Sequence, residues 1–303
     1  MKGTTGIVFE GGGGRGAYQV GAWKYLHEKG LDKNVTVVSG TSVGALNASL
    51  FVGSSVEKAE EVWRNINPRT ILTPKNIEPE DVAKWLKDNG FKMDKNGKLP
   101  ADEAYKKAFE KALITLSLGI SKSGMDSLAR MFVNHMRTDC IFSREGIISL
   151  INDGLDYNQI KNNKVECLAT CVKIPDFKME RFVLNEQTEE GVKRVLLATS
   201  AIPVIFPNEI INGSHYCDGG CPVVGDNIPI RPVYEKGVDT IIVIRLKRGQ
   251  KTDRRYYPKA RVIEIMPSQD LGNVVTGMLD FTPEGSARRF ELGYRDAKNV
   301  FGL

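Results

Sequence analysis

The sequence predicts an α/β fold with a mainly parallel central sheet flanked by helices. Three observations predict it: short apolar runs of strand character recur along the chain, helical patterns alternate with the first of them, and glycine-rich turns separate strand from helix. A chain of 303 residues is long enough to bury a substantial core. We expect a single domain over residues 1–303, with a helical, cap-like insertion at about residues 62–139.

The first fifty residues contain the unit strand–turn–helix twice. Residues 6–9 form an apolar run that ends in glycines, and residues 16–29 then carry apolar side chains at helical spacing. Residues 35–38 form the second strand, and a helix rich in small residues follows over 45–50. Consecutive units of this kind place the C-terminal ends of parallel strands at one edge of the sheet, where open α/β proteins keep their sites.

The remainder of the chain continues the alternation after the insertion. Residues 62–139 are charged and mostly helical by pattern. Strand patterns then lie at residues 165–174, 177–184, 214–218, 239–246 and 261–267, and helical patterns lie at residues 189–201 and 285–301.

Composition and charge exclude several classes of protein. The 42 basic and 37 acidic residues give a net charge of +5, which is too small to indicate nucleic-acid binding. The first residues contain no apolar core of the kind found in signal peptides, and no apolar run is long enough to span a bilayer. Five cysteines without a secretion signal favour a cytoplasmic protein with reduced thiols.

Two further patterns have ordinary explanations. Residues 245–261 are basic and include two adjacent tyrosines, so they could contact anionic headgroups at a membrane surface, but a solvated loop explains them equally well. Cysteines recur four residues apart at 167/171 and 217/221, a spacing that can hold zinc. Because strand residues four apart are separated by ~13 Å, one metal ion cannot bind both Cys167 and Cys171. We therefore expect no metal site.

The turn over residues 10–16 reads EGGGGRG, and its bare backbone needs a reason because glycine costs folding entropy. Gly11, Gly13 and Gly16 match a dinucleotide-binding pattern, but the next strand ends without the acid that would hold the ribose. A phosphate loop would have lysine where this chain has Ala17. Two interpretations are left: an oxyanion hole made of backbone N–H groups, and a turn that only packs tightly.

The second turn, GTSVG at residues 40–44, favours the oxyanion hole. It has the pattern G-x-S-x-G between a strand and a helix, which is the nucleophile elbow of hydrolases. Gly40 and Gly44 permit the sharp turn, and the following helix places its positive end beneath Ser42. Two adjacent crossovers then bring Ser42 close to the glycine turn.

A serine nucleophile needs a base, and the chain has 3 histidines. His27 lies at the end of the first helix and His135 lies in the insertion, and neither belongs to a motif. His215 precedes Asp218 on a short predicted strand, where residues three apart point to opposite faces. Asp218 begins a glycine turn and is the better candidate, because a buried carboxylate with a raised pKa can act as the base directly.

Four motifs, in the expected order, resemble those of the patatin-like phospholipase family. They are the glycine-rich turn EGGGGRG (10–16), the elbow GTSVGALNA (40–48), the stretch ATSAIPVIFP (198–207), and the Asp-Gly-Gly motif at 218–220. The resemblance covers residues 6–50 and 195–246 and hardly extends to the insertion.

This sequence departs from the family pattern at two positions. Glu10 stands before the glycines, where the family often has aspartate, and Thr199 replaces a serine of the Ala-Ser-x-Ala-x-Pro stretch. Neither position is one of the two catalytic residues that the resemblance implies, Ser42 and Asp218, so we expect the chain to be competent for hydrolysis.

The resemblance implies a three-layer α/β/α fold and a serine lipid acyl hydrolase that cleaves carboxylic esters of phospholipids or related acyl lipids. It implies a catalytic dyad of Ser42 as nucleophile and Asp218 as base, with no cofactor and no metal. It also implies an oxyanion hole built from backbone amides and supported by Arg15, with Gly11, Gly12, Gly13 and Gly14 as the donors. The glycines that support the motifs are Gly16, Gly40, Gly44, Gly219 and Gly220.

Two alternatives stay open at this point. A thioesterase or acyltransferase could use the same dyad with a different leaving group or acceptor. A catalytically silent lipid-binding or storage protein is the alternative from another class, and the intact Ser42 and Asp218 argue against it. The expected partner is an acyl lipid or phospholipid substrate, with peripheral membrane contact as a further possibility and no nucleic acid.

Overall fold

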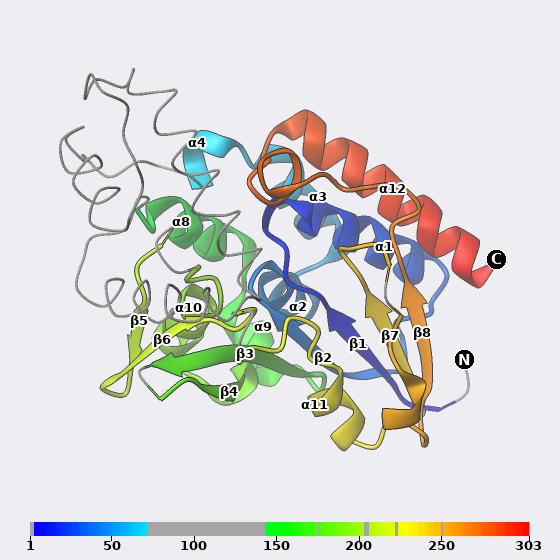
Figure 1. The fold of residues 1–303 in the computed structure, drawn as a ribbon, viewed down its shortest axis with the longest axis horizontal. Coiled ribbons are helices and arrows are strands. Elements are labelled where there is room, and N and C mark those ends of the chain that lie inside the picture. The colour runs from blue at the N-terminus through cyan, green and yellow to red at the C-terminus, as the bar shows by residue number, and fades with distance from the viewer. Residues whose placement is uncertain are drawn as a thin grey trace, which may run out of the picture.

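The computed structural model describes residues 3–71, 143–174, 176–202, 206–221, 224–249 and 251–302. Within these residues, helices pack on a single mixed sheet (Figure 1). The strands are β1 (Thr5–Phe9), β2 (Val35–Thr41), β3 (Glu166–Ile174), β4 (Lys178–Val183), β5 (Glu209–Ile211), β6 (Ser214–Asp218), β7 (Thr240–Ile244) and β8 (Arg261–Ile265). The helices are α1 (Ala17–Glu28), α2 (Val43–Gly53), α3 (Val56–Asn65), α4 (Pro68–Ile71), α8 (Glu145–Gly154), α9 (Tyr157–Asn162), α10 (Glu189–Thr199), α11 (Ile230–Glu235) and α12 (Pro283–Phe301).

The sheet is parallel at its centre, which confirms the predicted fold class. Its strand order is β5-β6-β3-β2-β1-β7-β8, and β4 pairs with β3 outside this path. The five strands from β3 to β8 in this order are all parallel to one another. The strands β4, β5 and β6 are antiparallel to their neighbours, because each belongs to a hairpin rather than to a crossover.

The central strands bury side chains on both faces, as parallel strands between two helical layers do. Ile7 and Phe9 of β1 belong to the larger core, which α1, α2 and α12 also line. Val8 points to the opposite face, where it packs with Val233 of α11. This alternation produces the three-layer arrangement visible in Figure 1.

The strand register brings two strand ends together at the centre of the sheet. β4 pairs with one edge of β3 along its length, so β2 and β6 share the other edge. β2 runs parallel to β3 and ends at Thr41, opposite Thr170. β6 runs antiparallel to β3 and ends at Asp218, opposite Cys171. The two strands therefore point at each other and end at consecutive positions of β3.

The structure corrects the expected start of the insertion. Residue 62 lies inside the continuous helix α3, whose Trp63 is buried in the main core. α3 packs against α1 and α12, so residues 62–65 belong to the body of the domain. The rest of the predicted insertion, from residue 72 to residue 139, lies outside the described residues.

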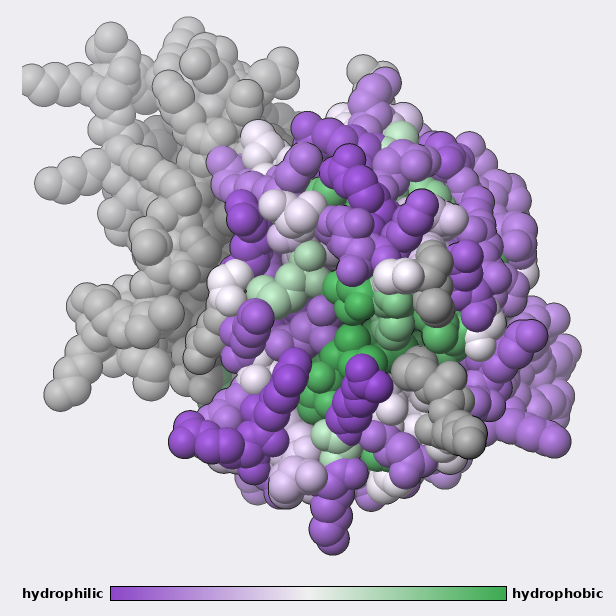
Figure 2. All heavy atoms as spheres, turned by 90° about the vertical axis from the view of Figure 1, so that its right-hand side faces the viewer, coloured by the Kyte–Doolittle hydropathy of each residue, from purple (hydrophilic) through white to green (hydrophobic). Residues whose placement is uncertain are grey.

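The face beside the edge strand β8 is shown in Figure 2. Hydrophilic side chains cover most of it, and a hydrophobic area lies at its centre. Within the described part of the chain, no helix has the length and apolar character needed to cross a bilayer.

Candidate active site

Ser42 lies at the sharp turn between β2 and α2. Its backbone has φ 55° and ψ −128°, a conformation that residues with a side chain rarely adopt. Ser42 is the N-cap residue of α2, so its side chain lies at the positive end of the helix dipole. The predicted elbow geometry is therefore present.

The elbow requires bare backbone on both sides of Ser42. A Cβ atom on Gly40 would lie 2.2 Å from the backbone of Gly44, and one on Gly44 would lie 2.2 Å from the carbonyl oxygen of Phe9. The Ser42 N–H donates a 2.9 Å hydrogen bond to Thr199 Oγ1. Thr199 in turn donates to the carbonyl oxygen of Thr170 at 2.6 Å. The threonine that departs from the family pattern thus fixes the nucleophile turn to β3.

Asp218 is a buried carboxylate at the end of β6. Its Oδ1 accepts a 2.7 Å hydrogen bond from the Gly220 N–H, whereas Oδ2 is buried without a hydrogen-bond partner among the described residues. Burial raises the pKa of Asp218 from 3.8 to about 6, while the Gly220 N–H, the neighbouring Ser42 hydroxyl and the Arg144 charge act in the opposite direction. A carboxylate with this pKa is charged at neutral pH and more basic than an exposed aspartate.

The two glycines after Asp218 are needed for close backbone approach. A Cβ atom on Gly219 would lie 2.1 Å from the carbonyl oxygen of Thr170. A Cβ atom on Gly220 would lie 2.6 Å from Asn227 Oδ1 and 3.1 Å from Asp218 Oδ1. These glycines therefore keep the carboxylate beside the middle of β3, next to the nucleophile turn.

The glycine turn begins with a buried polar anchor. Glu10 Oε2 accepts hydrogen bonds from the Leu246 N–H at 2.6 Å and from Arg245 Nε at 3.2 Å. Asn227 brackets Gly11, because its carbonyl oxygen accepts from the Gly11 N–H at 3.0 Å and its Nδ2 donates to the Gly11 carbonyl at 3.1 Å. The Gly11 amide is thus already used within the fold, which corrects its assignment as an oxyanion donor.

Gly12, Gly13 and Gly14 remain as candidate donors. Gly13–Gly16 form a 3₁₀ turn, whose first N–H groups have no acceptor within the turn. Gly13 has φ 59° and lines the same pocket as Ser42. The two turns are therefore adjacent, as the sequence predicts.

The bare backbone of this turn is required mainly by neighbouring protein. A Cβ atom on Gly13 would lie 2.2 Å from the carbonyl oxygen of Met278, and one on Gly14 would lie 2.3 Å from that of Asp280. Both contacts come from the C-terminal part of the chain. These contacts support the tight-packing interpretation, and the oxyanion hole stays a prediction.

Arg15 fastens the glycine turn to the same C-terminal region. The side chain is 6% exposed, and its Nη2 donates to the carbonyl oxygens of Gly272 at 2.6 Å and Asn273 at 3.2 Å. Its supporting role is therefore mechanical, through the segment around residue 272.

An apolar pocket opens beside Ser42. The space between its walls is about 640 Å³, including the part open to solvent, and almost all of its surface is apolar. Leu46 and Leu50 of the elbow helix α2, Ile147 of α8, and Phe206 are among the residues that line it. Its apolar lining favours an apolar ligand.

Comparison with known proteins identifies the family. A sequence model described as Patatin-like phospholipase matches residues 7–234 of the chain. The chain belongs to the patatin-like phospholipase family. Membership of this family supports the hydrolysis of lipid esters as the activity of the chain. The matched residues include the elbow, the glycine turn and Asp218, and they end within α11.

A solved structure shows the same fold. The chain is similar to VipD from Legionella pneumophila, with a TM-score of 0.53 and 16% identity over 100% of this chain and 67% of VipD. A weaker similarity, with a TM-score of 0.44 and 14% identity, relates 100% of the chain to 53% of the type III effector protein ExoU. The chain therefore spans about half the length of ExoU, which is from Pseudomonas aeruginosa. No curated protein sequence matches the chain.

The described histidines make contacts elsewhere in this patatin-like domain. His27 Nδ1 lies 2.8 Å from Asp32 Oδ2 on the surface, and His215 Nδ1 lies 2.9 Å from Asn208 Oδ1. His215 lies three residues before Asp218 on β6, so the two side chains point to opposite faces of the sheet. His135 lies outside the described residues.

Sequence reasoning missed several residues that hold the site together. Asn47 of α2 donates to the Gly16 carbonyl at 3.0 Å and accepts from Trp63 Nε1 at 2.9 Å, which ties the elbow helix to the glycine turn. Asn227 and Arg245 lie in the stretch that resembles the family, but no local pattern indicates their contacts with Gly11 and Glu10. The cysteines at 167, 171, 217 and 221 are buried free thiols, and no metal-binding cluster occurs among the residues that the structure describes.

Proposed function

We propose that the protein is a serine lipid acyl hydrolase that works through a Ser42–Asp218 dyad. One observation carries the proposal: the strand register brings Ser42 and a buried Asp218 to the same point of β3, beside an apolar pocket. Membership of the patatin-like phospholipase family supports the same class of reaction.

The chemistry follows from the roles that each group can take. Ser42 Oγ attacks the acyl carbonyl carbon, and Asp218 accepts the hydroxyl proton as the bond forms. The negative oxygen of the tetrahedral intermediate points to the N–H groups of Gly12, Gly13 and Gly14. The positive end of α2 adds to this stabilisation.

Asp218 then completes the cycle as an acid. It returns its proton to the leaving alcohol, and the acyl group stays on Ser42. A water molecule then gives a proton to Asp218 as its oxygen attacks the acyl carbonyl carbon. When the bond from this carbon to Ser42 Oγ breaks, Asp218 returns the proton to Ser42 Oγ and the fatty acid is released. A pKa of about 6 suits both steps, because the group is charged in the resting enzyme and can hold a proton for the time of the reaction.

The pocket supports an acyl lipid as the substrate. An acyl chain that enters the pocket would contact Leu46, Leu50 and Phe206 and few polar groups. A carbonyl bound next to Ser42 would place a fatty acyl chain in this space and leave the alcohol part outside.

Substitutions of the dyad test the proposal. We expect Ser42→Ala and Asp218→Asn to lower kcat for p-nitrophenyl esters by more than about 1,000-fold while both variants stay folded. His215→Ala is the matched control and should keep most of the activity, because its partner is Asn208. If His215→Ala is as inactive as Ser42→Ala while folded, the dyad is wrong.

A fluorophosphonate probe separates the remaining functions. Labelling of the wild type at Ser42 is expected, and a silent lipid-binding protein would give none. Product analysis with phospholipid and an added alcohol or thioester then separates hydrolysis from acyl transfer.

The pH profile gives a supporting measurement. Activity should fall as the pH decreases through about 6, because protonated Asp218 cannot accept the serine proton. An exposed aspartate would keep its charge to about pH 4. Because a histidine would titrate in the same range as Asp218, the pH profile has to be read together with the substitutions.

A further inference from the structure

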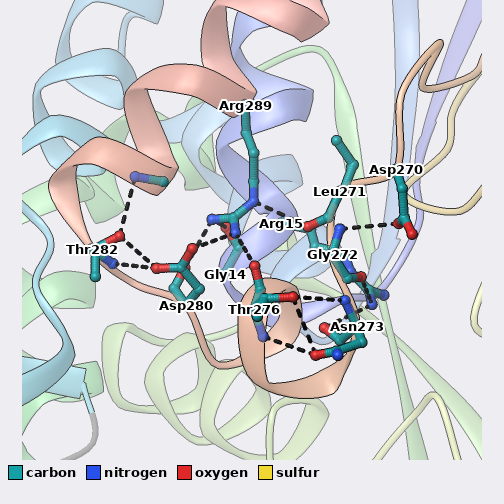
Figure 3. Close-up of polar contacts among 11 residues, drawn as sticks. Gly14, Arg15, Asp270, Leu271, Gly272, Asn273, Thr276, Asp280, Thr282 and Arg289 are labelled. Carbon is teal, nitrogen blue, oxygen red and sulfur yellow. Dashed lines mark hydrogen bonds and ion pairs between the residues drawn. The ribbon is translucent and has the colours of Figure 1, made fainter.

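Arg289 of α12 is among the most deeply buried charged side chains, with 1% exposure, and it lies beyond the residues that the family model matches. Figure 3 shows its guanidinium surrounded by acceptors. Nη1 donates to the carbonyl oxygens of Asp280 at 2.9 Å and Gly14 at 3.3 Å. Nη2 donates to the Thr276 carbonyl at 2.7 Å and forms a 2.6 Å ion pair with Asp280 Oδ2. Nε donates to the Leu271 carbonyl at 3.4 Å.

These acceptors belong to two parts of the site. Four of the five contacts go to the segment 271–280, and one goes to Gly14 in the glycine turn. Arg289 therefore joins the glycine turn to the segment 271–280 from a third element, α12. Arg15 makes a parallel link, from the glycine turn to Gly272.

The segment 271–281 forms part of the site in two ways. Its backbone covers the glycine turn closely, since the carbonyls of Met278 and Asp280 occupy the positions that side chains at Gly13 and Gly14 would need. Its side chains Met278, Leu279 and Phe281 line the pocket at Ser42. A displacement of this segment would therefore move the amide donors and the pocket wall together.

We propose that Arg289 is a positioning residue. Through its hydrogen bonds to backbone carbonyls, it orients the amides of the glycine turn and the 271–281 wall of the acyl pocket. The proposal rests on the proposed function, because it assigns those amides to the oxyanion. The hydrogen bond to the Gly14 carbonyl fixes the peptide plane next to the one that carries the Gly14 N–H. Misplacement of catalytic groups by about 1 Å can cost on the order of 100-fold in rate.

Arg289→Met tests the proposal, because methionine keeps an unbranched apolar stem and removes every hydrogen bond. We expect kcat for p-nitrophenyl butyrate to fall by about 10- to 100-fold, with KM changed less than about threefold, because this short chain makes little use of the pocket wall. Arg289→Lys should recover part of kcat, because its ammonium can still pair with Asp280.

Two control variants separate positioning from loss of stability. Arg288→Met removes a neighbouring exposed arginine and should keep wild-type kcat. Val233→Ala opens a cavity in the core on the opposite face of the sheet and should lower the melting temperature without lowering kcat at temperatures where it is folded.

Hydrogen exchange of the peptide over residues 11–17 gives a readout that needs no activity. Arg289→Met should increase exchange there, and Val233→Ala should not. If folded Arg289→Met keeps kcat within twofold and leaves this exchange unchanged, the inference is overturned. If Arg289→Met does not fold, kcat and the exchange over residues 11–17 are measured for Arg289→Lys and Asp280→Asn instead, with the same outcomes deciding. Wild-type protein that lacks esterase activity would overturn the proposed function, whereas unchanged kcat and unchanged exchange in Arg289→Met would overturn only the role of Arg289.

Discussion

The two turns that meet at the site, the elbow at residues 40–44 and the glycine turn at residues 10–16, reach their shapes by different routes. In the elbow, Gly40 and Gly44 leave room for each other and for the carbonyl of Phe9, all within the first two strand–helix units. In the glycine turn, the neighbours of Gly13 and Gly14 are the carbonyls of Met278 and Asp280, more than 200 residues later in the chain.

This difference shows where each half of the site is encoded. The path of the elbow follows from its own residues, and Thr199 adds one long-range hydrogen bond. The glycine turn is completed by α12 and the segment before it, which Arg15 and Arg289 fasten to it. A change in the C-terminal region should therefore affect the candidate oxyanion donors before it affects the nucleophile turn.

Gly13→Ala should have the largest effect on stability. An alanine there has to adopt φ 59° and would place Cβ 2.2 Å from the Met278 carbonyl oxygen. Strain and overpacking together should lower the free energy of unfolding by about 2–5 kcal/mol. Gly237→Ala is the matched control, because Gly237 has φ 73° and nothing within 4 Å of its Cβ position. Equal losses in urea unfolding for the two variants would show that the distant segment does not constrain the turn.

Asp218→Asn should stabilise the protein at neutral pH while it removes activity. The pKa of Asp218 rises from 3.8 to about 6 because burial disfavours the charged carboxylate in the folded protein. Above pH 6 this lowers the free energy of unfolding by ~3 kcal/mol. The protonated form is favoured in the folded state, so this cost decreases as the pH falls below 6 and disappears below about pH 4.

Urea unfolding of wild type and Asp218→Asn at a series of pH values measures this effect. Asparagine can still accept from the Gly220 N–H, so the comparison isolates the charge. A stability difference that does not change between pH 4 and pH 7.5 would contradict the raised pKa.

Ser42→Gly should show the smallest change in stability, and the informative result is whether it is more or less stable than Ser42→Ala. Glycine usually destabilises a fixed backbone position by about 0.5–1 kcal/mol relative to alanine. At Ser42 the backbone has φ 55° and ψ −128°, where a side chain is strained by about 1–3 kcal/mol. We therefore expect inactive Ser42→Gly to be more stable than inactive Ser42→Ala by about 1 kcal/mol in thermal or urea unfolding. The opposite order would show that the elbow is not strained.

Local sequence signals predicted the two turns because the strands and helices on either side of each turn are continuous in the sequence. The runs at residues 6–9 and 35–38 are strands whose ends continue into the two turns, and β2 extends to Thr41 so that it ends directly at Ser42. The spacing of His215 and Asp218 correctly placed their side chains on opposite faces of β6. The start of the insertion was misplaced, because the charged pattern around residue 62 belongs to a helix with only one buried stripe.

The sequence by itself determined the α/β class, the nucleophile turn and the pair of candidate residues Ser42 and Asp218, because periodicity and turn glycines act over a few residues. Only the tertiary structure decided that Ser42 and Asp218 come close together, since this depends on β2 and β6 meeting end to end along β3. It also decided that the Gly11 amide is bonded to Asn227 and that Arg289 reaches Gly14. Such contacts join residues hundreds of positions apart, and no local pattern records which distant carbonyl will occupy the space beside a glycine.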